Sequence, residues 1–152
     1  MWYASHLRRW IMKPDQCIFF QLAKANQLAS RFLGQRVAKL NITPIQALVL
    51  GFLSDEDNIT SSELGKRTGL DSATLTGIID RLASAQYIER VENPANRRSN
   101  QICLTQLGKT QASEAVQVIV AANREFLKIL TEQEQKEFRA VIRKLRDQAG
   151  RD

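Results

Sequence analysis

Start and stop signals for two short helices constrain this chain more than any other feature of its sequence. Thr60-Ser61-Ser62-Glu63 has the form of a capping box, in which a threonine and a glutamate satisfy the first backbone amides of a helix. That helix is predicted to stop at Thr68-Gly69, and Asp71 can cap a second one. Two short helices joined by a tight glycine turn predict a helix-turn-helix. The apolar residues of the second helix share one face: Leu75, Ile78, Ile79 and Leu82.

A β-hairpin is predicted directly after these helices. Short alternating strands near residues 87–91 and 101–104 flank a polar turn that is rich in asparagine and contains Pro94. A hairpin that follows a helix-turn-helix makes a winged helix. The predicted fold class is therefore mainly α with a small β-wing.

Long helices are predicted on both sides of this motif. Residues 14–40 form one that is apolar around much of its circumference, so other elements or a second chain should cover it. Thr43-Pro44-Ile45-Gln46 starts a helix that reaches about Leu53. Thr105 caps a helix from about Gln106 to Leu130. A third capping box, Thr131 to Glu134, opens the last helix, whose apolar stripe is Phe138, Val141, Ile142 and Leu145.

Composition excludes several classes of protein. The chain has 152 residues, 43% of them hydrophobic, and no apolar run approaches the roughly 18 residues of a membrane-spanning helix. Its single histidine, His6, and two widely separated cysteines supply neither a metal cluster nor a catalytic triad, and no glycine-rich phosphate loop is present. We expect no enzyme, no cofactor and no metal. A reducing cytoplasm is the simplest location for two cysteines that form no framework.

Three stretches resemble the MarR-type winged-helix transcriptional regulators: LNITPIQALVL, SSELGKRTGLDSATLTGIIDRL and NPANRRSNQICLTQLG. The resemblance covers about residues 15–148. It implies a homodimer whose first and last helices intertwine, with one winged helix per subunit offered to duplex DNA. Residues 15–40 and 105–148 would then form a helical dimerisation region and residues 41–104 the DNA-binding region of one compact domain. Residues 1–14 are predicted to be a tail or lead-in, and Met12 could be the true start.

Within the proposed recognition helix, the face opposite the apolar stripe carries small and hydroxyl-bearing side chains. Such side chains allow close approach to DNA, hydrogen-bond phosphates or base edges, and offer methyl groups to thymine. Backbone amides at the helix start favour a phosphate. Taken alone, the segment also fits an ordinary solvated face. The residues predicted to contact DNA are Ser72, Ala73, Thr74, Thr76, Gly77 and Arg81.

The family's wing carries an acidic residue shortly before an arginine. Here Asn96 stands where aspartate is usual, so it can orient an arginine only without charge assistance. Arg98 matches the arginine that enters the minor groove, whereas Arg97 and Arg90 are predicted to contact phosphates. An arginine pair that faces solvent is the alternative.

The resemblance also implies a small-molecule effector, because many relatives release DNA when an aromatic acid enters a crevice beside the dimerisation helices. An aromatic carboxylate or an acyl thioester is the expected class. Side chains of the first helix could line such a crevice, but phenylalanines at this spacing are also typical of a core, and no ligand residue is assigned. The residues considered are Phe19, Phe20, Asn26, Arg31 and Arg36.

Thiol oxidation is an alternative signal. Counted back from Asn41-Ile42-Thr43, the cysteine of peroxide-responsive relatives falls on Phe19, and Cys17 lies two residues earlier, about 200° around a helix. Cys17 and Cys103 are therefore predicted to be structural or incidental. A winged-helix interaction module that does not read DNA is the rival class, and an acidic or bulky recognition face would favour it.

Net charge argues less for DNA than it first suggests. The chain carries +6, but residues 1–40 alone hold +6, residues 41–60 hold −3, residues 61–104 hold +1 and residues 105–152 hold +2. The winged helix is nearly neutral. DNA binding by this chain would depend on a few placed arginines rather than on a general positive field.

We predict that Arg98→Ala weakens binding to a specific DNA site by roughly 1–3 kcal/mol, because the minor-groove contact is lost. Loss of an arginine that contacts phosphate should instead lower the slope of log affinity against log salt by about one. Mobility-shift titrations at several salt concentrations measure both quantities. Unchanged affinity in Arg98→Ala would remove the wing tip from the mechanism.

Overall fold

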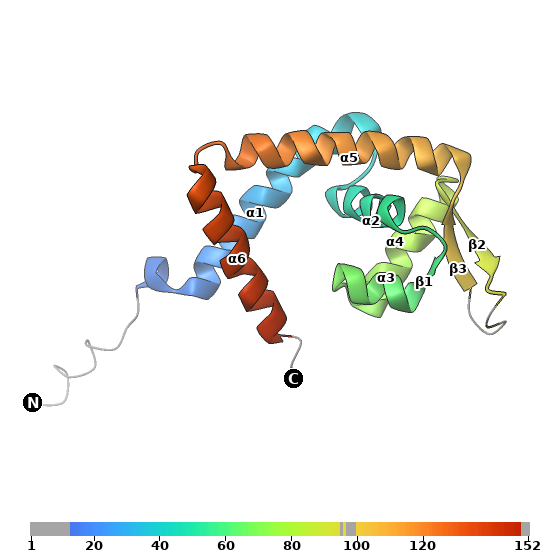
Figure 1. The fold of residues 1–152 in the computed structure, drawn as a ribbon, viewed down its shortest axis with the longest axis horizontal. Helices are drawn as coiled ribbons and strands as arrows, with labels where there is room; N and C mark the ends of the chain where they lie inside the picture. Colours follow the sequence, from blue (N-terminus) through green and yellow to red (C-terminus); the bar gives the residue numbers. More distant parts are fainter. Residues whose placement is uncertain (1–12, 95, 97–99, 150–152) are drawn as a thin grey trace, which may run out of the picture.

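The computed structural model describes residues 13–94, 96 and 100–149. Its longest helix, α5, runs along one side of an elongated molecule and joins a winged helix at one end to α1 and α6 at the other (Figure 1). The element order is η2 (Pro14–Gln16), α1 (Ile18–Val37), η3 (Ala38–Leu40), α2 (Pro44–Asp55), β1 (Ile59–Thr60), α3 (Ser61–Thr68), α4 (Ser72–Ser84), β2 (Ile88–Glu92), β3 (Asn100–Leu104), α5 (Gln106–Leu127) and α6 (Glu132–Ala149). The predicted fold class, a winged helix flanked by long helices, is confirmed.

Local capping chemistry sets where the helices begin. In α3 the Thr60 hydroxyl accepts from the Glu63 amide at 3.2 Å, while the Glu63 carboxylate accepts from the Thr60 amide at 2.7 Å. The Thr43–Gln46 box of α2 and the Thr131–Glu134 box of α6 have the same reciprocal bonds. Each pair satisfies backbone amides that have no partner within the helix. All three predicted boxes are present.

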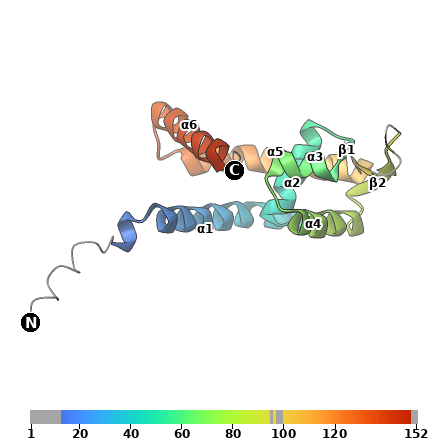
Figure 2. The same cartoon turned by 90° about the horizontal axis from the view of Figure 1, so that it is seen from below.

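Helix α2 lies at the centre of the core. Its buried residues pack against α5 on one side and against the helix-turn-helix on the other, and Leu50, Leu53, Leu64 and Ile79 are all fully buried there. At roughly 1.5–3 kcal/mol for each fully buried aliphatic side chain, this cluster is the main source of stability in the winged-helix end. Helices α1, α5 and α6 extend away from it (Figure 2).

The sheet contains one strand that the sequence did not predict. Its strand order is β1-β3-β2 with antiparallel pairs, and the unpredicted strand, β1, pairs Ile59 with Ile102. The predicted hairpin is confirmed as β2 and β3, in the register that sets Arg90 opposite Ile102. Strand β1 covers one edge of the wing and draws the start of α3 towards it.

Gly108 fixes the angle between the wing and α5. A Cβ at this position would lie 1.7 Å from the Tyr87 carbonyl oxygen, so no other residue fits. Thr105 strengthens the same junction, since its hydroxyl donates to the Gln86 carbonyl at 2.7 Å and its amide donates to the Tyr87 carbonyl at 3.1 Å. The wing is thereby attached to the long helix by backbone contact.

Three predicted helix boundaries were wrong by a few residues. The helix expected over 14–40 is three elements, because Cys17 has extended backbone angles and the last turn, 38–40, is a 3-10 helix. Helix α2 continues to Asp55, and α5 ends at Leu127. Among the described residues, no single helix is long and apolar enough to cross a membrane, although 18–40 and 44–55, bent by 74°, would suffice together.

The capping carboxylates connect folding stability to pH. Hydrogen bonds from the Thr60 amide and hydroxyl hold the pKa of Glu63 below its ordinary value of 4.5, and the Thr131 amide and hydroxyl do the same for Glu134. Bonds from the Thr74 hydroxyl and amide hold the pKa of Asp71 below 3.8. A lowered pKa in the folded state means that these groups stabilise the fold above the ordinary pKa and lose that contribution as pH falls through the lowered one.

We expect the variant carrying Glu63→Gln, Asp71→Asn and Glu134→Gln to lose less thermal stability than the unchanged chain when pH is lowered from about 6 to 3. Amide side chains keep the caps but do not titrate. Melting temperatures across this range, followed by circular dichroism, give the comparison. Parallel curves for the two proteins would show that the caps contribute nothing to acid unfolding.

Candidate nucleic-acid interface

One face of α4 is open to solvent. The apolar stripe packs inward, and Leu75, Ile78, Ile79 and Leu82 are all at most 5% exposed. All six residues predicted to contact DNA from this helix are exposed: Ser72, Ala73, Thr74, Thr76, Gly77 and Arg81. Nothing lies within 4 Å of where a Gly77 side chain would begin. The structure therefore brings these six residues onto one accessible surface.

Hydrogen bonds within α4 restrict what its threonines can do. The Thr74 hydroxyl donates to the Asp71 carboxylate at 2.6 Å, and the Thr76 hydroxyl donates to the Ser72 carbonyl at 2.8 Å. Both hydroxyl hydrogens are thus committed, and a phosphate offers only acceptors. These threonines can accept from amino groups of bases or present their methyl groups, but they cannot donate to phosphate without breaking these bonds. The Ser72 hydroxyl has no such bond among the described residues.

Arg90 lies on β2 and reaches across to α4. Its Nη2 donates to Asp80 Oδ1 at 2.6 Å, with 44% of the arginine side chain and 55% of the aspartate side chain exposed. The pair joins the wing to the solvent-exposed face of α4. Asp80 is not among the residues that the sequence predicted to contact DNA.

The tip of the wing is only partly described. The Asn96 amide donates to the Asn93 carbonyl at 3.1 Å, which closes a turn at the end of the hairpin, and Asn96 itself is exposed. Arg97 and Arg98, for which the sequence predicted phosphate and minor-groove contacts, lie outside the described residues. Their roles stay predictions.

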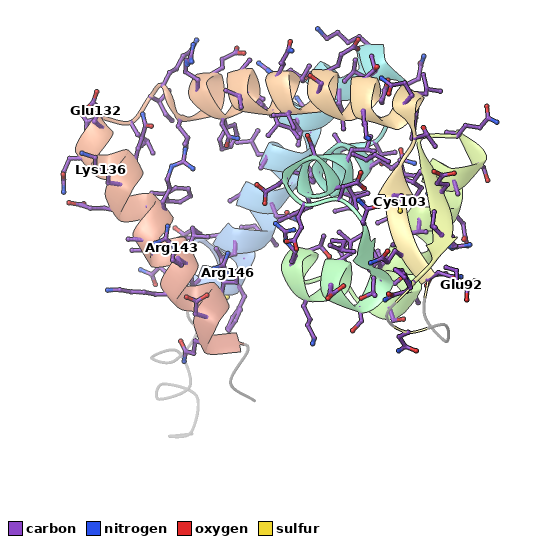
Figure 3. All side chains as sticks on the ribbon, turned by 45° about the vertical axis from the view of Figure 1, so that its right-hand side comes forward. Glu92, Cys103, Glu132, Lys136, Arg143 and Arg146 are labelled. Carbon is purple, nitrogen blue, oxygen red and sulfur yellow. The ribbon has the colours of Figure 1, made fainter. Side chains whose placement is uncertain are left out.

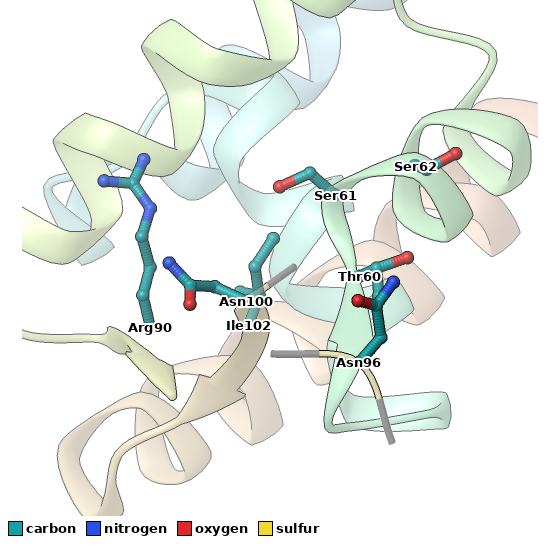
Figure 4. A pocket seen from close by; sticks show the side chains of 7 residues that line it. All are labelled: Thr60, Ser61, Ser62, Arg90, Asn96, Asn100 and Ile102. Atoms are coloured by element: carbon teal, nitrogen blue, oxygen red, sulfur yellow. The ribbon is translucent and has the colours of Figure 1, made fainter. Parts of the chain in front are cut away.

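A cleft of about 490 Å³ separates the wing from the start of α3 (Figure 4). Arg90 stands on one side of it and residues 60–62 on the other, with Ile102 at its base. Ser61, Ser62 and Asn100 were not predicted to belong to this surface, because nothing in the sequence relates the first turn of α3 to the wing. The pairing of β1 with β3 brings them to the wing. The lining residues are Thr60, Ser61, Ser62, Arg90, Asn96, Asn100 and Ile102.

The side chains of α1 that were considered for an effector crevice are arranged differently in the structure. Phe19 is 79% exposed and Phe20 46%, so in this chain neither belongs to the core. Arg36 is paired: its Nη2 lies 2.8 Å from Glu125 Oε2, and its guanidinium lies 3.3 Å above the centre of the Phe32 ring. The Arg36 hydrogen bond holds the pKa of Glu125 below its usual value.

Two cavities lie between α1 and its neighbouring helices. The smaller, about 150 Å³, lies between α1, α2 and α5 beside the edge-to-face pair Phe32–Phe126, whose centroids are 5.0 Å apart. The larger, about 650 Å³, lies between α1, α5 and α6, with Asn26 and three arginines of α6 along it. Arg31 lines a shallow hollow with Lys24.

Within the described residues, neither thiol belongs to a cluster that could hold a metal ion. No cluster of three metal-ligating side chains occurs within the described part of the chain. Cys103 is buried, with its Sγ 2.9 Å from Asn58 Oδ1, and burial raises the pKa of this thiol. A raised pKa disfavours the reactive thiolate.

Comparison with known proteins agrees with this geometry. A model of the MarR family matches residues 40–99. An uncharacterized HTH-type transcriptional regulator of Bacillus subtilis, YcgE, is 34% identical over 86 residues, which are 51% of this chain and 56% of that protein. The chain thus spans about half the length of the curated relatives it matches.

Solved structures are similar over more of the chain. A probable transcriptional regulator from Pseudomonas aeruginosa has a TM-score of 0.82 at 27% identity, covering 88% of this chain and 99% of the other. A mutant of MarR from E. coli, complexed with operator DNA, has a TM-score of 0.76 at 29% identity, covering 82% and 90%. These similarities include the long helices as well as the winged helix.

We predict opposite effects of Gly77→Ala on folding and on DNA binding. Alanine should stabilise the exposed helix by roughly 0.5–1 kcal/mol, whereas a methyl group on the surface nearest the DNA should raise the Kd for a specific duplex about tenfold, a cost of about 1.4 kcal/mol. Thermal unfolding and fluorescence anisotropy measure the two effects.

Gly51→Ala in α2 is the matched control. An added Cβ there makes ordinary contact with Val116 and Ile119 at 3.8 and 3.9 Å, away from α4. It should stabilise the fold without changing the Kd. If both variants bind DNA as tightly as the unchanged chain, Gly77 does not face DNA.

Proposed function

We propose that this chain, which is similar to the MarR family of winged-helix proteins over residues 40–99, is a dimeric, sequence-specific DNA-binding regulator of transcription that acts as a repressor. Helix α4 would enter the major groove, and the wing would follow the adjacent backbone and minor groove. The single observation that carries the proposal is the exposed face of α4, whose small side chains lie beside the Arg90 side of the wing.

The likeness to a DNA complex supports this assignment. The E. coli MarR mutant whose structure contains operator DNA is 29% identical to this chain over an alignment that covers 82% of this chain and 90% of the mutant. The shape of α4 supports it independently, because a bulky or acidic face would favour a protein partner. Here Asp80 is the only acid exposed on the helix beyond its cap, and Arg90 pairs with it.

Unpartnered helix surface supports the proposed dimer. Every described residue of α6 from 136 to 148 is exposed, including the apolar stripe of Phe138, Val141, Ile142 and Leu145. Exposed apolar residues of α1 add to this surface: Ile18, Phe19, Phe20, Leu22 and Leu28. A monomer rarely leaves so much contiguous apolar surface in water. A second copy of the chain is the occupant that we propose for it.

The charge pattern of α6 fits a two-fold arrangement. Its first turns carry three glutamates and one lysine, and the turns that follow carry four basic residues and one aspartate. These are Glu132, Glu134, Lys136 and Glu137, then Arg139, Arg143, Lys144, Arg146 and Asp147. Figure 3 shows Glu132 near the start of the helix and Arg143 and Arg146 towards its end. Two such helices running antiparallel about a two-fold axis place acidic ends against basic ends. A two-fold dimer would present its recognition helices about 34 Å apart, so the operator should be a pseudo-palindrome.

Effector control is part of the proposal. The cavity between α1, α2 and α5 is smaller than the roughly 300 Å³ at which most small-molecule sites begin. An aromatic acid that entered this cavity would have to separate Phe32 from Phe126, which would move α1 relative to the core helices that carry the winged helix. The cavity of about 650 Å³ between α1, α5 and α6 is large enough without such a movement, and its arginines could pair with a carboxylate. Oxidation of Cys103 has weaker support, because this thiol is buried and has a raised pKa, whereas Cys17 at the start of α1 is half-buried.

The direct test is binding of the purified chain to duplex DNA from upstream of its own gene, with an unrelated duplex of equal length as competitor. Selective binding to the first duplex is the expected result. Repeating the titration with aromatic carboxylates, acyl thioesters and dilute peroxide compares the candidate signals. Equal affinity for both duplexes would favour an interaction module over a regulator.

We predict that Phe138→Glu weakens the dimer about a hundredfold. Each subunit then loses roughly 1.5 kcal/mol of apolar burial at the interface. Sedimentation velocity across a concentration series measures dissociation, and binding to the paired half-sites should fall in parallel. Leu107→Glu is the control, since Leu107 is 53% exposed at the winged-helix end of α5. A Phe138→Glu protein that stays dimeric would exclude α6 from the interface.

A further inference from the structure

Asp80 is an unusual residue for a surface that meets DNA. It lies on the exposed side of α4, where a carboxylate would repel phosphates. Its one ion pair in the described structure is with Arg90, at 2.6 Å from Nη2 to Oδ1. The bond uses one of the five N–H donors of the guanidinium, so several remain available for a second acceptor.

The cleft beside Arg90 is suited to an anion. Its other sides carry hydroxyl and amide groups, and Figure 4 shows Ser61 and Asn100 directed into the space next to Arg90. The start of α3 does not supply the positive charge, because the Glu63 carboxylate already occupies the Thr60 amide and hydroxyl. Arg90 is the one cationic side chain among the described residues that line this cleft.

We propose that Asp80 is a positioning residue, which holds the Arg90 guanidinium at the mouth of this cleft so that its free N–H groups bind a DNA backbone phosphate between the recognition helix and the wing. The inference rests on the proposed function. An arginine on a strand otherwise samples many rotamers, and fixing it beforehand lowers the entropy lost on binding. Ser61 and Asn100 would donate further hydrogen bonds to the same phosphate.

A positioning role for Asp80 and simple repulsion of DNA by Asp80 predict opposite changes in DNA affinity when Asp80 is replaced. If Asp80 only repels DNA, removing its charge strengthens binding. If Asp80 positions Arg90, removing it weakens binding, and only while Arg90 is present. Folding should barely change in either case, because exposed ion pairs contribute about 0–1 kcal/mol to stability. A change in DNA affinity with unchanged melting temperature therefore separates positioning from a structural role.

The experiment measures the Kd of the full chain for its specific duplex at several salt concentrations, for Asp80→Ala, Asp80→Asn, Arg90→Ala and the Asp80→Ala/Arg90→Ala double variant. We expect Asp80→Ala to raise the Kd about five- to tenfold and to lower the salt slope, whereas Asp80→Asn, which can still accept from Arg90, has a smaller effect. Arg90→Ala should lower the salt slope by about one, and the double variant should match it.

Glu89→Gln is the matched control. Glu89 is an exposed carboxylate on the same strand, next to Arg90 in sequence, with no ion pair among the described residues. Removing its charge should leave binding unchanged or slightly stronger. The proposal is overturned if Asp80→Ala binds DNA as tightly as the unchanged chain, or more tightly. It is also overturned if replacing Asp80 weakens DNA binding by the same factor when Arg90 is already replaced by alanine. If the unchanged chain shows no preference for the specific duplex, the proposed function itself fails and the proposal falls with it.

Discussion

The burial of α2 is the constraint on which the rest of this structure depends. Ala47, Val49, Leu50 and Leu53 have no exposed surface, and the helix packs against α5, α1 and the helix-turn-helix at once. Such an apolar helix is stable in water only when other elements cover most of its surface. Here Leu48 is the apolar residue of α2 that stays exposed, at 38%. The winged helix and the long helices are therefore built around one shared core, and α4 keeps its orientation relative to α5 through it.

Helices α1 and α6 bury little of their apolar surface against this core. Helix α1 buries only Val37, and α6 contacts α5 mainly at their junction, where Gln135 donates to the Leu127 and Leu130 carbonyls. The chain therefore has one end with a complete core and one end with apolar surface still to be covered. This division matches the proposed roles, in which one end reads DNA and the other holds the subunits together.

Local signals in the sequence predicted most of the fold. Capping boxes involve neighbours three residues apart, so Thr60 with Glu63 and Thr131 with Glu134 could be recognised without tertiary information. Strand β1 could not, because two residues carry no periodicity and its only reason to be extended is pairing with β3. The exposed side of α4 was predicted from its inward stripe, but the Asp80–Arg90 pair and the cleft depend on how the wing folds back.

The sequence by itself determined which segments become helices, where they start, and which side of each is apolar, since all of these are set by residues within a few positions of one another. The tertiary structure decided what those sides meet. The tertiary structure alone shows that Gly108 packs against Tyr87 and that Arg90 pairs with a carboxylate on α4. It alone shows that Phe19 and Phe138 are exposed. The physical reason is that contact between distant segments depends on the packing of the whole chain, whereas caps and stripes depend on their own helix.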